Sequence, residues 1–311
     1  MTHSSSPLSE NAVLLAKRAL QSGDRVLVTG ASGWFGRTST WLFKELAIPV
    51  FLTGSHSRTI HYLGKSFEIN EWNISDVNRF EPTIVIDCAY LTREFTETTS
   101  LDNYVAVNRD LVDRFIAMSK WPSVRRMIGF SSGAAFRYAS GEVEHDISRD
   151  PYGVLKYESE LRLSNEIESA KSKVSIPRVW SVAGSLVTKP NGFAFSDLIS
   201  QARSGTVTIN SENKVLRRYC LIEEVIAIAL QENLMQSCVF DTGGESIEIG
   251  ELAKIICDQV NPDASIVRNG QLRGEANDYR SSNIDWIERC SQLAFKSKTI
   301  IDQISQVSRF M

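Results

Sequence analysis

Tyr152 and Lys156 lie four residues apart, a spacing that places both side chains on one face of a helix. A phenol loses its proton near pH 10, so a tyrosine that exchanges protons near neutrality needs a pKa lower by ~3, or ~4 kcal/mol. An ammonium group ~4 Å away supplies about that much at an effective dielectric constant of ~20. The pair therefore predicts proton transfer to or from a substrate hydroxyl or carbonyl, with Tyr152 as the acid/base.

Ser132 is the second candidate for chemistry. It lies in Phe130-Ser131-Ser132-Gly133, directly after the short apolar run Val124–Phe130. If that run is a strand of a parallel sheet, its carboxyl end lies at the edge where ligands bind. A serine at this edge can orient or polarise the reacting oxygen, and we predict that role for Ser132.

A glycine-rich loop, Thr29-Gly30-Ala31-Ser32-Gly33-Trp34-Phe35-Gly36, follows the β-branched run Arg25–Thr29 and precedes a helical pattern. Glycines permit a tight turn and close backbone approach, while the helix N-terminus offers free N–H groups to a pyrophosphate. We predict that a dinucleotide binds here. Its expected contacts in the loop are Gly30, Ser32, Gly33, Trp34, Phe35 and Gly36.

The segment Thr53–Arg58 favours NADP over NAD. NAD enzymes usually have an acidic residue after the second strand, yet this chain has no acid between Glu45 and Glu68. Arg58 and a serine such as Ser55 would instead suit a 2′-phosphate. NAD remains the alternative.

The alternation of short apolar runs with helical segments predicts an α/β fold. Short, nearly continuous apolar runs alternate with helical segments, notably Leu101–Lys120 and Tyr152–Lys171. Strands without alternation suit a sheet covered on both faces, and strand alternating with helix indicates a doubly wound parallel sheet. We predict a tail and short helix over residues 1–24, a dinucleotide-binding domain over 25–180, and a smaller α+β substrate lobe over 181–311. Segments from about 215–242 are expected to return to the sheet.

Composition excludes several other classes of protein. The 311 residues carry a net charge of −3, which provides no basic surface for nucleic acid. No apolar run approaches the ~18 residues that span a membrane, and Ala12–Ala16 is followed by Lys17-Arg18, the reverse of a secretory signal. The five cysteines form no CxxC pair and the four histidines are scattered, so we expect no metal site and a cytoplasmic protein.

Taken together, these features resemble the extended branch of the short-chain dehydrogenases/reductases, the NAD(P)-dependent epimerase/dehydratase family. Thr29–Gly36 matches its TGxxGxxG pattern, and Ser132, Tyr152 and Lys156 match its catalytic triad. The resemblance runs from about Arg25 to the C-terminus. It implies a Rossmann-type fold, a nucleotide-sugar substrate, and a homodimer formed through the two long helices.

The resemblance also implies further site residues. Cys88, Ala89 and Tyr90 occupy the family's cofactor-flanking segment after a strand, and Asn108 matches a helix asparagine that supports the active site. Ser181 lies in a segment similar to RxxNxxG beside the substrate. Arg217 begins a segment similar to RDxxxVDD, whose arginine commonly contacts a substrate diphosphate.

Several departures from the family pattern reduce the number of reactions that we expect of this chain. Asp87 replaces a histidine, Ser181 an asparagine, and Phe136-Arg137 a Tyr-Gly pair. Gly133-Ala134 follow Ser132 where sugar dehydratases have Asp-Glu, so epimerisation or reduction of a keto-sugar is expected rather than elimination of water. The alternatives are a reductase of another small carbonyl compound and a dinucleotide-binding regulator without catalysis.

Overall fold

The computed structural model describes residues 6–167, 172–231, 239–270, 272 and 274–311. The chain forms two compact units, each assembled from separate stretches of sequence. One comprises Leu15–Val179 and Ile226–Phe240, and the other Met1–Leu14, Trp180–Val225 and Asp241–Met311. The domain ranges predicted above stay a prediction. Ile226–Phe240 lies within the stretch that was expected to return to the sheet, and Met1–Leu14 groups with the other unit.

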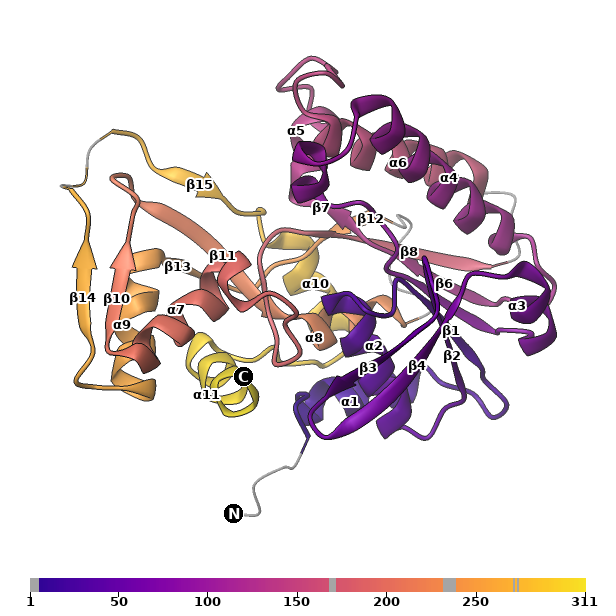
Figure 1. Ribbon diagram of the computed structural model, residues 1–311, viewed down its shortest axis with the longest axis horizontal. Coiled ribbons are helices and arrows are strands. Elements are labelled where there is room, and N and C mark those ends of the chain that lie inside the picture. Colours follow the sequence, from indigo (N-terminus) through magenta and orange to yellow (C-terminus); the bar gives the residue numbers. More distant parts are fainter. Residues whose placement is uncertain (1–5, 168–171, 232–238, 271, 273) are drawn as a thin grey trace. The chain divides into compact units, whose positions relative to one another are not determined.

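A mostly parallel sheet forms the centre of the first unit, in the order β12-β8-β6-β5-β1-β2-β4-β3 (Figure 1). Each interior strand is short and apolar; β1, for example, is buried along its whole length. Such strands need cover on both faces, which explains why their sequences do not alternate. The strands are β1 (Val26–Thr29), β2 (Val50–Gly54), β3 (Arg58–Tyr62), β4 (Lys65–Glu71), β5 (Ile84–Asp87), β6 (Arg126–Gly129), β7 (Ser131–Ser132), β8 (Lys173–Val179) and β12 (Val239–Asp241).

Helices connect these strands and cover the sheet, with α4 and α6 side by side on one face and α2 on the other (Figure 1). The predicted helix Leu101–Lys120 is α4, and Tyr152–Lys171 is α6 as far as Ile167; residues 168–171 lie outside the described part. The predicted Rossmann-type parallel fold is therefore confirmed. The helical elements are α2 (Trp34–Glu45), α3 (Ile74–Phe80), η1 (Arg93–Glu97), α4 (Leu101–Ser119), α5 (Gly133–Ala139) and α6 (Pro151–Ile167).

The strand order reverses between β1 and β5. From β1 the chain builds outward through β2 and β4, then crosses back to place β5 on the other side of β1. In an open α/β sheet this reversal leaves a crevice at the carboxyl ends of the two strands, and ligands bind there. The glycine loop follows β1 and Cys88 follows β5, so the topology brings both segments to that crevice.

The antiparallel hairpin β3–β4 was not predicted. Its turn, Leu63-Gly64, has positive φ at both residues (48° and 72°), as a two-residue hairpin turn of type I′ requires. Leucine is an unusual residue in that conformation, so the sequence lacks the customary Asn-Gly signal. Arg58 consequently begins a strand and does not belong to a loop.

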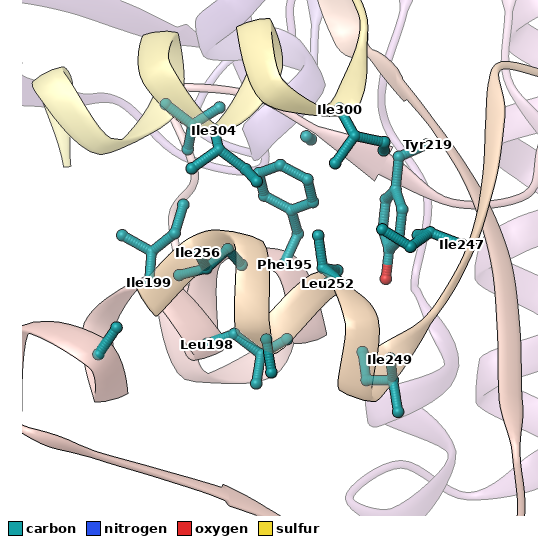
Figure 2. Close-up of a cluster of buried hydrophobic side chains, with 14 of the residues drawn as sticks. Phe195, Leu198, Ile199, Tyr219, Ile247, Ile249, Leu252, Ile256, Ile300 and Ile304 are labelled. Carbon is teal, nitrogen blue, oxygen red and sulfur yellow. The ribbon is translucent and has the colours of Figure 1, made fainter. Parts of the chain in front are cut away.

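The second unit contains small sheets and a helical core. Strands β9 (Val182–Ala183), β11 (Val215–Leu221), β13 (Glu245–Glu248) and β15 (Asn277–Tyr279) form one sheet, and β10 (Thr206–Ile209) pairs with β14 (Ser265–Arg268). Helices α7 (Ala194–Ser204), α9 (Ile249–Val260) and α11 (Ile300–Phe310) bury their apolar faces around Phe195, Leu252 and Ile304 (Figure 2). The remaining elements are α1 (Glu10–Arg18), η2 (Pro190–Gly192), α8 (Ile222–Ala229) and α10 (Ile284–Gln292).

Candidate active site

Two glycines allow the loop after β1 to pack closely against its neighbours. Gly30 has a φ of +57°, and a Cβ at this position would lie 2.5 Å from the Cys88 carbonyl oxygen. A Cβ at Gly36 would lie 2.4 Å from the Gly30 carbonyl oxygen. Both glycines are therefore required by the fold of the loop itself.

Gly33 differs from these two glycines because its surroundings are open. It is exposed, has a φ of −72°, and a Cβ there would meet only the Gly30 carbonyl oxygen, at 3.4 Å. Gly33 is also the N-cap of α2, and no side chain caps that end of the helix. The N-terminus of α2 thus carries no side-chain cap, and Gly33 leaves room there for an anionic ligand.

Two guanidinium groups converge on Ser32. Arg58 Nη2 donates to the Ser32 hydroxyl, and Arg37 Nε donates to the Ser32 carbonyl at 3.1 Å. The Arg37 guanidinium also lies 5.1 Å from the centre of the Tyr62 ring. Burial and the charge of Arg58 lower the pKa of Arg37. The structure thus adds Arg37 to the predicted pair, whereas Ser55 is exposed and bonds to His56 Nδ1 at 3.0 Å.

Lys156 is buried at the carboxyl edge of the sheet, with only 7% of its surface exposed. Its ammonium donates to the Phe130 carbonyl oxygen at 2.7 Å and lies 3.3 Å from the centre of the Tyr90 ring. Burial lowers the pKa of Lys156 to about 7, while the carboxylates of Asp87 and Glu160 act in the opposite direction. Burial thus weakens proton binding by Lys156, and the two carboxylates oppose that loss.

The Tyr152 ring has aromatic and cationic neighbours. Tyr90 meets it edge-on, with ring centres 6.1 Å apart, and the Arg93 guanidinium lies 5.4 Å from its centre. Lys156 follows one helical turn later on α6. Its ammonium lies over the ring of Tyr90, the same ring that contacts Tyr152. Tyr152, Tyr90 and Lys156 thus form one contiguous cluster, in which the Tyr90 ring contacts both of the other side chains.

Ser132 is buried at the N-terminus of α5, where its hydroxyl accepts a hydrogen bond from the Ala134 N–H at 3.2 Å. This cap fixes the serine oxygen at the end of β7, two residues after Phe130. Phe35, from the start of α2, packs against Phe130 in a tilted arrangement with ring centres 4.6 Å apart. The glycine loop and the serine segment are therefore held together by direct packing.

Asn108 supports the loop after β5 from beneath. Its side chain is buried, accepts from the Leu91 N–H at 2.8 Å and donates to the Leu91 carbonyl at 3.3 Å. The Tyr104 hydroxyl donates to the same carbonyl at 2.7 Å. Residues on α4 thus fix the backbone next to Tyr90, which gives Asn108 a supporting position in this structure.

An ion pair between half-buried Arg178 and buried Glu160, which sequence reasoning overlooked, connects α6 to β8. Arg178 donates to both oxygens of Glu160, with Nε–Oε1 at 2.8 Å and Nη2–Oε2 at 2.7 Å. The Ser131 hydroxyl donates to the same carboxylate. Glu160 lies four residues after Lys156 and so shares its helix face, which was the available signal. The pair holds the helix that carries Tyr152 and Lys156.

An open cavity of about 500 Å³ lies beside this cluster in the same unit. Its lining includes Arg93, which contacts Tyr152, and Asp150, which pairs with Arg93 at 3.4 Å. Arg137 and Arg149 are also part of the wall. The cavity beside Arg93 is thus lined mainly by charged side chains, which suit a hydroxyl-rich or charged ligand.

Ser181 and Arg217 belong to the other compact unit, so their surroundings are considered within that unit alone. Arg217 lies on β11, donates to the Asn277 carbonyl at 2.9 Å, and lies 5.6 Å from the centre of the Tyr279 ring. The Tyr279 ring packs against Trp180, with ring centres 4.9 Å apart. Sequence reasoning overlooked this aromatic pair beside Arg217, because Trp180 and Tyr279 are far apart in the sequence.

Comparison with known proteins connects this geometry to a family. The sequence profile of the NAD dependent epimerase/dehydratase family matches residues 26–250. The chain belongs to this family. The predicted resemblance is thereby confirmed, although no protein with curated function shows significant sequence similarity to the chain.

Solved structures of this epimerase/dehydratase fold agree with the chain over most of its length. The NAD-dependent NDP-hexosamine 5,6-dehydratase TunA has a TM-score of 0.70 at 15% identity, covering 92% of this chain and 97% of its own. The UDP-glucose 4-epimerase of Thermotoga maritima with UDP-glucose has a TM-score of 0.63 at 18% identity, covering 92% of this chain and 98% of its own. The UDP-glucuronic acid 4-epimerase of Bacillus cereus with NAD has a TM-score of 0.64 at 19% identity, covering 92% of this chain and 96% of its own. At these identities the likeness shows the fold.

The family implies a nicotinamide dinucleotide, and the residues after β1 fit one. Gly33 leaves open space at the uncapped N-terminus of α2, which suits a pyrophosphate. Within the described residues, no cluster of three or more His, Cys, Asp or Glu side chains could hold a metal ion. In the same residues, no helix combines the length and hydrophobicity needed to cross a membrane.

The contrast between Gly33 and Gly36 gives a testable prediction. Gly33→Ala should leave the free energy of unfolding nearly unchanged, because its Cβ meets only ordinary contacts, but should weaken dinucleotide binding by about tenfold or more. Gly36→Ala should instead destabilise the fold by about 1–3 kcal/mol, because its Cβ clashes with backbone. Urea unfolding and isothermal titration calorimetry measure the two effects. Unchanged dinucleotide affinity in Gly33→Ala would contradict this placement of the pyrophosphate.

Proposed function

We propose that this protein is an NAD(P)-dependent epimerase or reductase that acts on a nucleotide-sugar. The observation that carries the proposal is the cluster of Tyr152, Tyr90 and buried Lys156 at the carboxyl edge of the sheet, where the Lys156 ammonium binds the carbonyl of Phe130, two residues before Ser132. The family shows that the fold is that of an NAD-dependent epimerase or dehydratase. The cluster supports the finer assignment of residues.

In the proposed reaction, Tyr152 exchanges a proton with the hydroxyl or carbonyl oxygen of the sugar. Lys156 supplies the positive charge that makes the phenolate accessible, and its remaining N–H groups suit ribose hydroxyls. Ser132 orients the reacting oxygen from its fixed position at the start of α5. The bound dinucleotide would accept or deliver the hydride.

Arg217 supports an anionic substrate. A guanidinium group half-buried beside an aromatic pair suits a diphosphate, which it can bind through two parallel hydrogen bonds. UDP-glucose is the ligand of the Thermotoga maritima epimerase, whose fold this chain shares. Ser181 would contact the sugar in place of the family's asparagine. A second copy docking along α4 and α6, forming a homodimer, is part of the same proposal.

Elimination of water is a less favoured reaction for this site. Gly133 and Ala134 follow Ser132 and are buried in α5, so neither position supplies an acid or a base. A reductase of another carbonyl compound remains the second candidate, and half-buried Arg217 favours the nucleotide-sugar over it. A regulator without catalysis is the third, and the complete set of Ser132, Tyr152 and Lys156 weighs against it.

We also propose that NADP is the preferred dinucleotide. Arg58 and Arg37 both donate to Ser32, so two positive charges lie next to the glycine loop that is predicted to bind the dinucleotide. Such a pair suits a 2′-phosphate. NAD, which the Bacillus cereus relative binds, is the alternative.

Replacing Tyr152 tests the proposed function. Tyr152→Phe removes the transferable proton but keeps the ring, so turnover of a nucleotide-sugar should fall on the order of a thousandfold while dinucleotide affinity stays the same. Tyr157→Phe, on the same helix, is the matched control and should retain turnover. Turnover can be followed by chromatography of the sugar products. Substantial turnover by Tyr152→Phe would sink the assignment.

Arg58→Gln tests the preference for NADP. It should weaken NADP binding about tenfold or more and leave NAD binding nearly unchanged, because only NADP carries the 2′-phosphate. Arg79→Gln removes an exposed arginine of α3 and serves as the control. Calorimetric titration gives each affinity. The preference is refuted if the unaltered protein binds NAD at least as tightly as NADP.

A further inference from the structure

The surroundings of Lys156 contain two residues whose role the proposed reaction does not explain, Asp87 and Tyr90. Asp87 replaces a histidine of the family pattern, so its role does not follow from family membership. Both residues lie at the carboxyl end of β5, one strand away from the Phe130 carbonyl that binds the ammonium. They therefore face the one buried charge on which the proposed acid/base chemistry depends.

The groups that face the Lys156 ammonium come from several elements. The Phe130 carbonyl oxygen accepts a hydrogen bond from the ammonium and the Tyr90 ring covers it, while the carboxylates of Asp87 and Glu160 act on it through their charge. Glu160 is already bound by Arg178 and Ser131. Asp87 and Tyr90 are thus the two groups left to offset the cost of burying the charge.

We propose that Tyr90 and Asp87 are positioning residues that keep Lys156 charged and fixed in place, Tyr90 through the face of its ring and Asp87 through its carboxylate. Where it concerns catalysis, this inference rests on the proposed function. An ammonium over an aromatic face gains attraction that grows when water is excluded, and Lys156 lies 3.3 Å from the ring centre in a buried setting.

The ring, and not the hydroxyl, is the active part of Tyr90. Its hydroxyl is buried near Ser159 but forms no hydrogen bond of ordinary geometry with the described residues. The ring contacts both Lys156 and Tyr152, and it is held there because Asn108 and Tyr104 fix the backbone of the next residue, Leu91. Removing the hydroxyl should therefore cost little.

Asp87 is the last residue of β5, which pairs with β1 on one side and β6 on the other. The Thr29 hydroxyl donates to its carboxylate, and Thr29, Asp87 and Gly129 are aligned across β1, β5 and β6. Burial raises the pKa of Asp87 to about 6, and the charge of Lys156 limits that rise. Each group thus favours the charged form of the other, and loss of the carboxylate should make Lys156 lose its proton at lower pH.

The test measures the titration of Lys156 directly, without requiring turnover. Protein containing lysine isotope-labelled at Cε is titrated by NMR, and the Lys156 signal is assigned from its absence in Lys156→Arg. We expect Tyr90→Phe to match the unaltered protein. Tyr90→Leu and Asp87→Asn should each weaken proton binding by Lys156 about tenfold. If turnover is observed, the alkaline limit of kcat/KM should move to lower pH in the same two variants.

The outcomes separate this inference from the proposed function. An unchanged Lys156 titration in folded Tyr90→Leu and Asp87→Asn would overturn the inference, whether or not the protein turns over a nucleotide-sugar. The expected titrations without any turnover would instead support the inference on Lys156 and count against the proposed function. If Tyr90→Leu does not fold, Tyr90→Met, which also lacks a ring, takes its place and must show the same tenfold change.

Discussion

The site is organised around one constraint, a lysine ammonium buried among sheet, helix and loop. Lys156 needs a backbone acceptor, a nearby negative charge and a covering surface, because an isolated buried charge is costly. The carboxyl end of β6 supplies the acceptor, β5 supplies Asp87, and the following loop supplies Tyr90. Tyr152, one helical turn earlier on α6, is placed by the same arrangement.

The parallel register makes this arrangement possible. Thr29, Asp87 and Gly129 are aligned on three adjacent strands, so whatever follows each strand emerges at one edge. The glycine loop can approach the β5 loop only because Gly30 lacks a Cβ, which would otherwise strike the Cys88 carbonyl. The closeness of the glycine loop to the loop after β5 therefore follows from the reversal of strand order between β1 and β5.

Local patterns in the sequence were sufficient to predict the parallel sheet, its long helices and the shared face of Tyr152 and Lys156. Those features depend on periodicity and short spacings. The β3–β4 hairpin was not predictable in the same way, because its turn uses leucine in a left-handed conformation. Nor were the contacts of Lys156 with Tyr90 or of Glu160 with Arg178, since both depend on how separate strands and loops meet.

The central claim is that a nicotinamide dinucleotide bound to this protein would exchange a hydride with a nucleotide-sugar, with Tyr152 as the acid/base. The most direct test is a single-turnover experiment in which the protein with oxidised dinucleotide is rapidly mixed with UDP-glucose or UDP-glucuronic acid. The account predicts that the absorbance of reduced nicotinamide rises in the unaltered protein with at least one of these sugars, and that Tyr152→Phe shows no such rise. Bound sugar and bound dinucleotide without any reduction of the nicotinamide would contradict it.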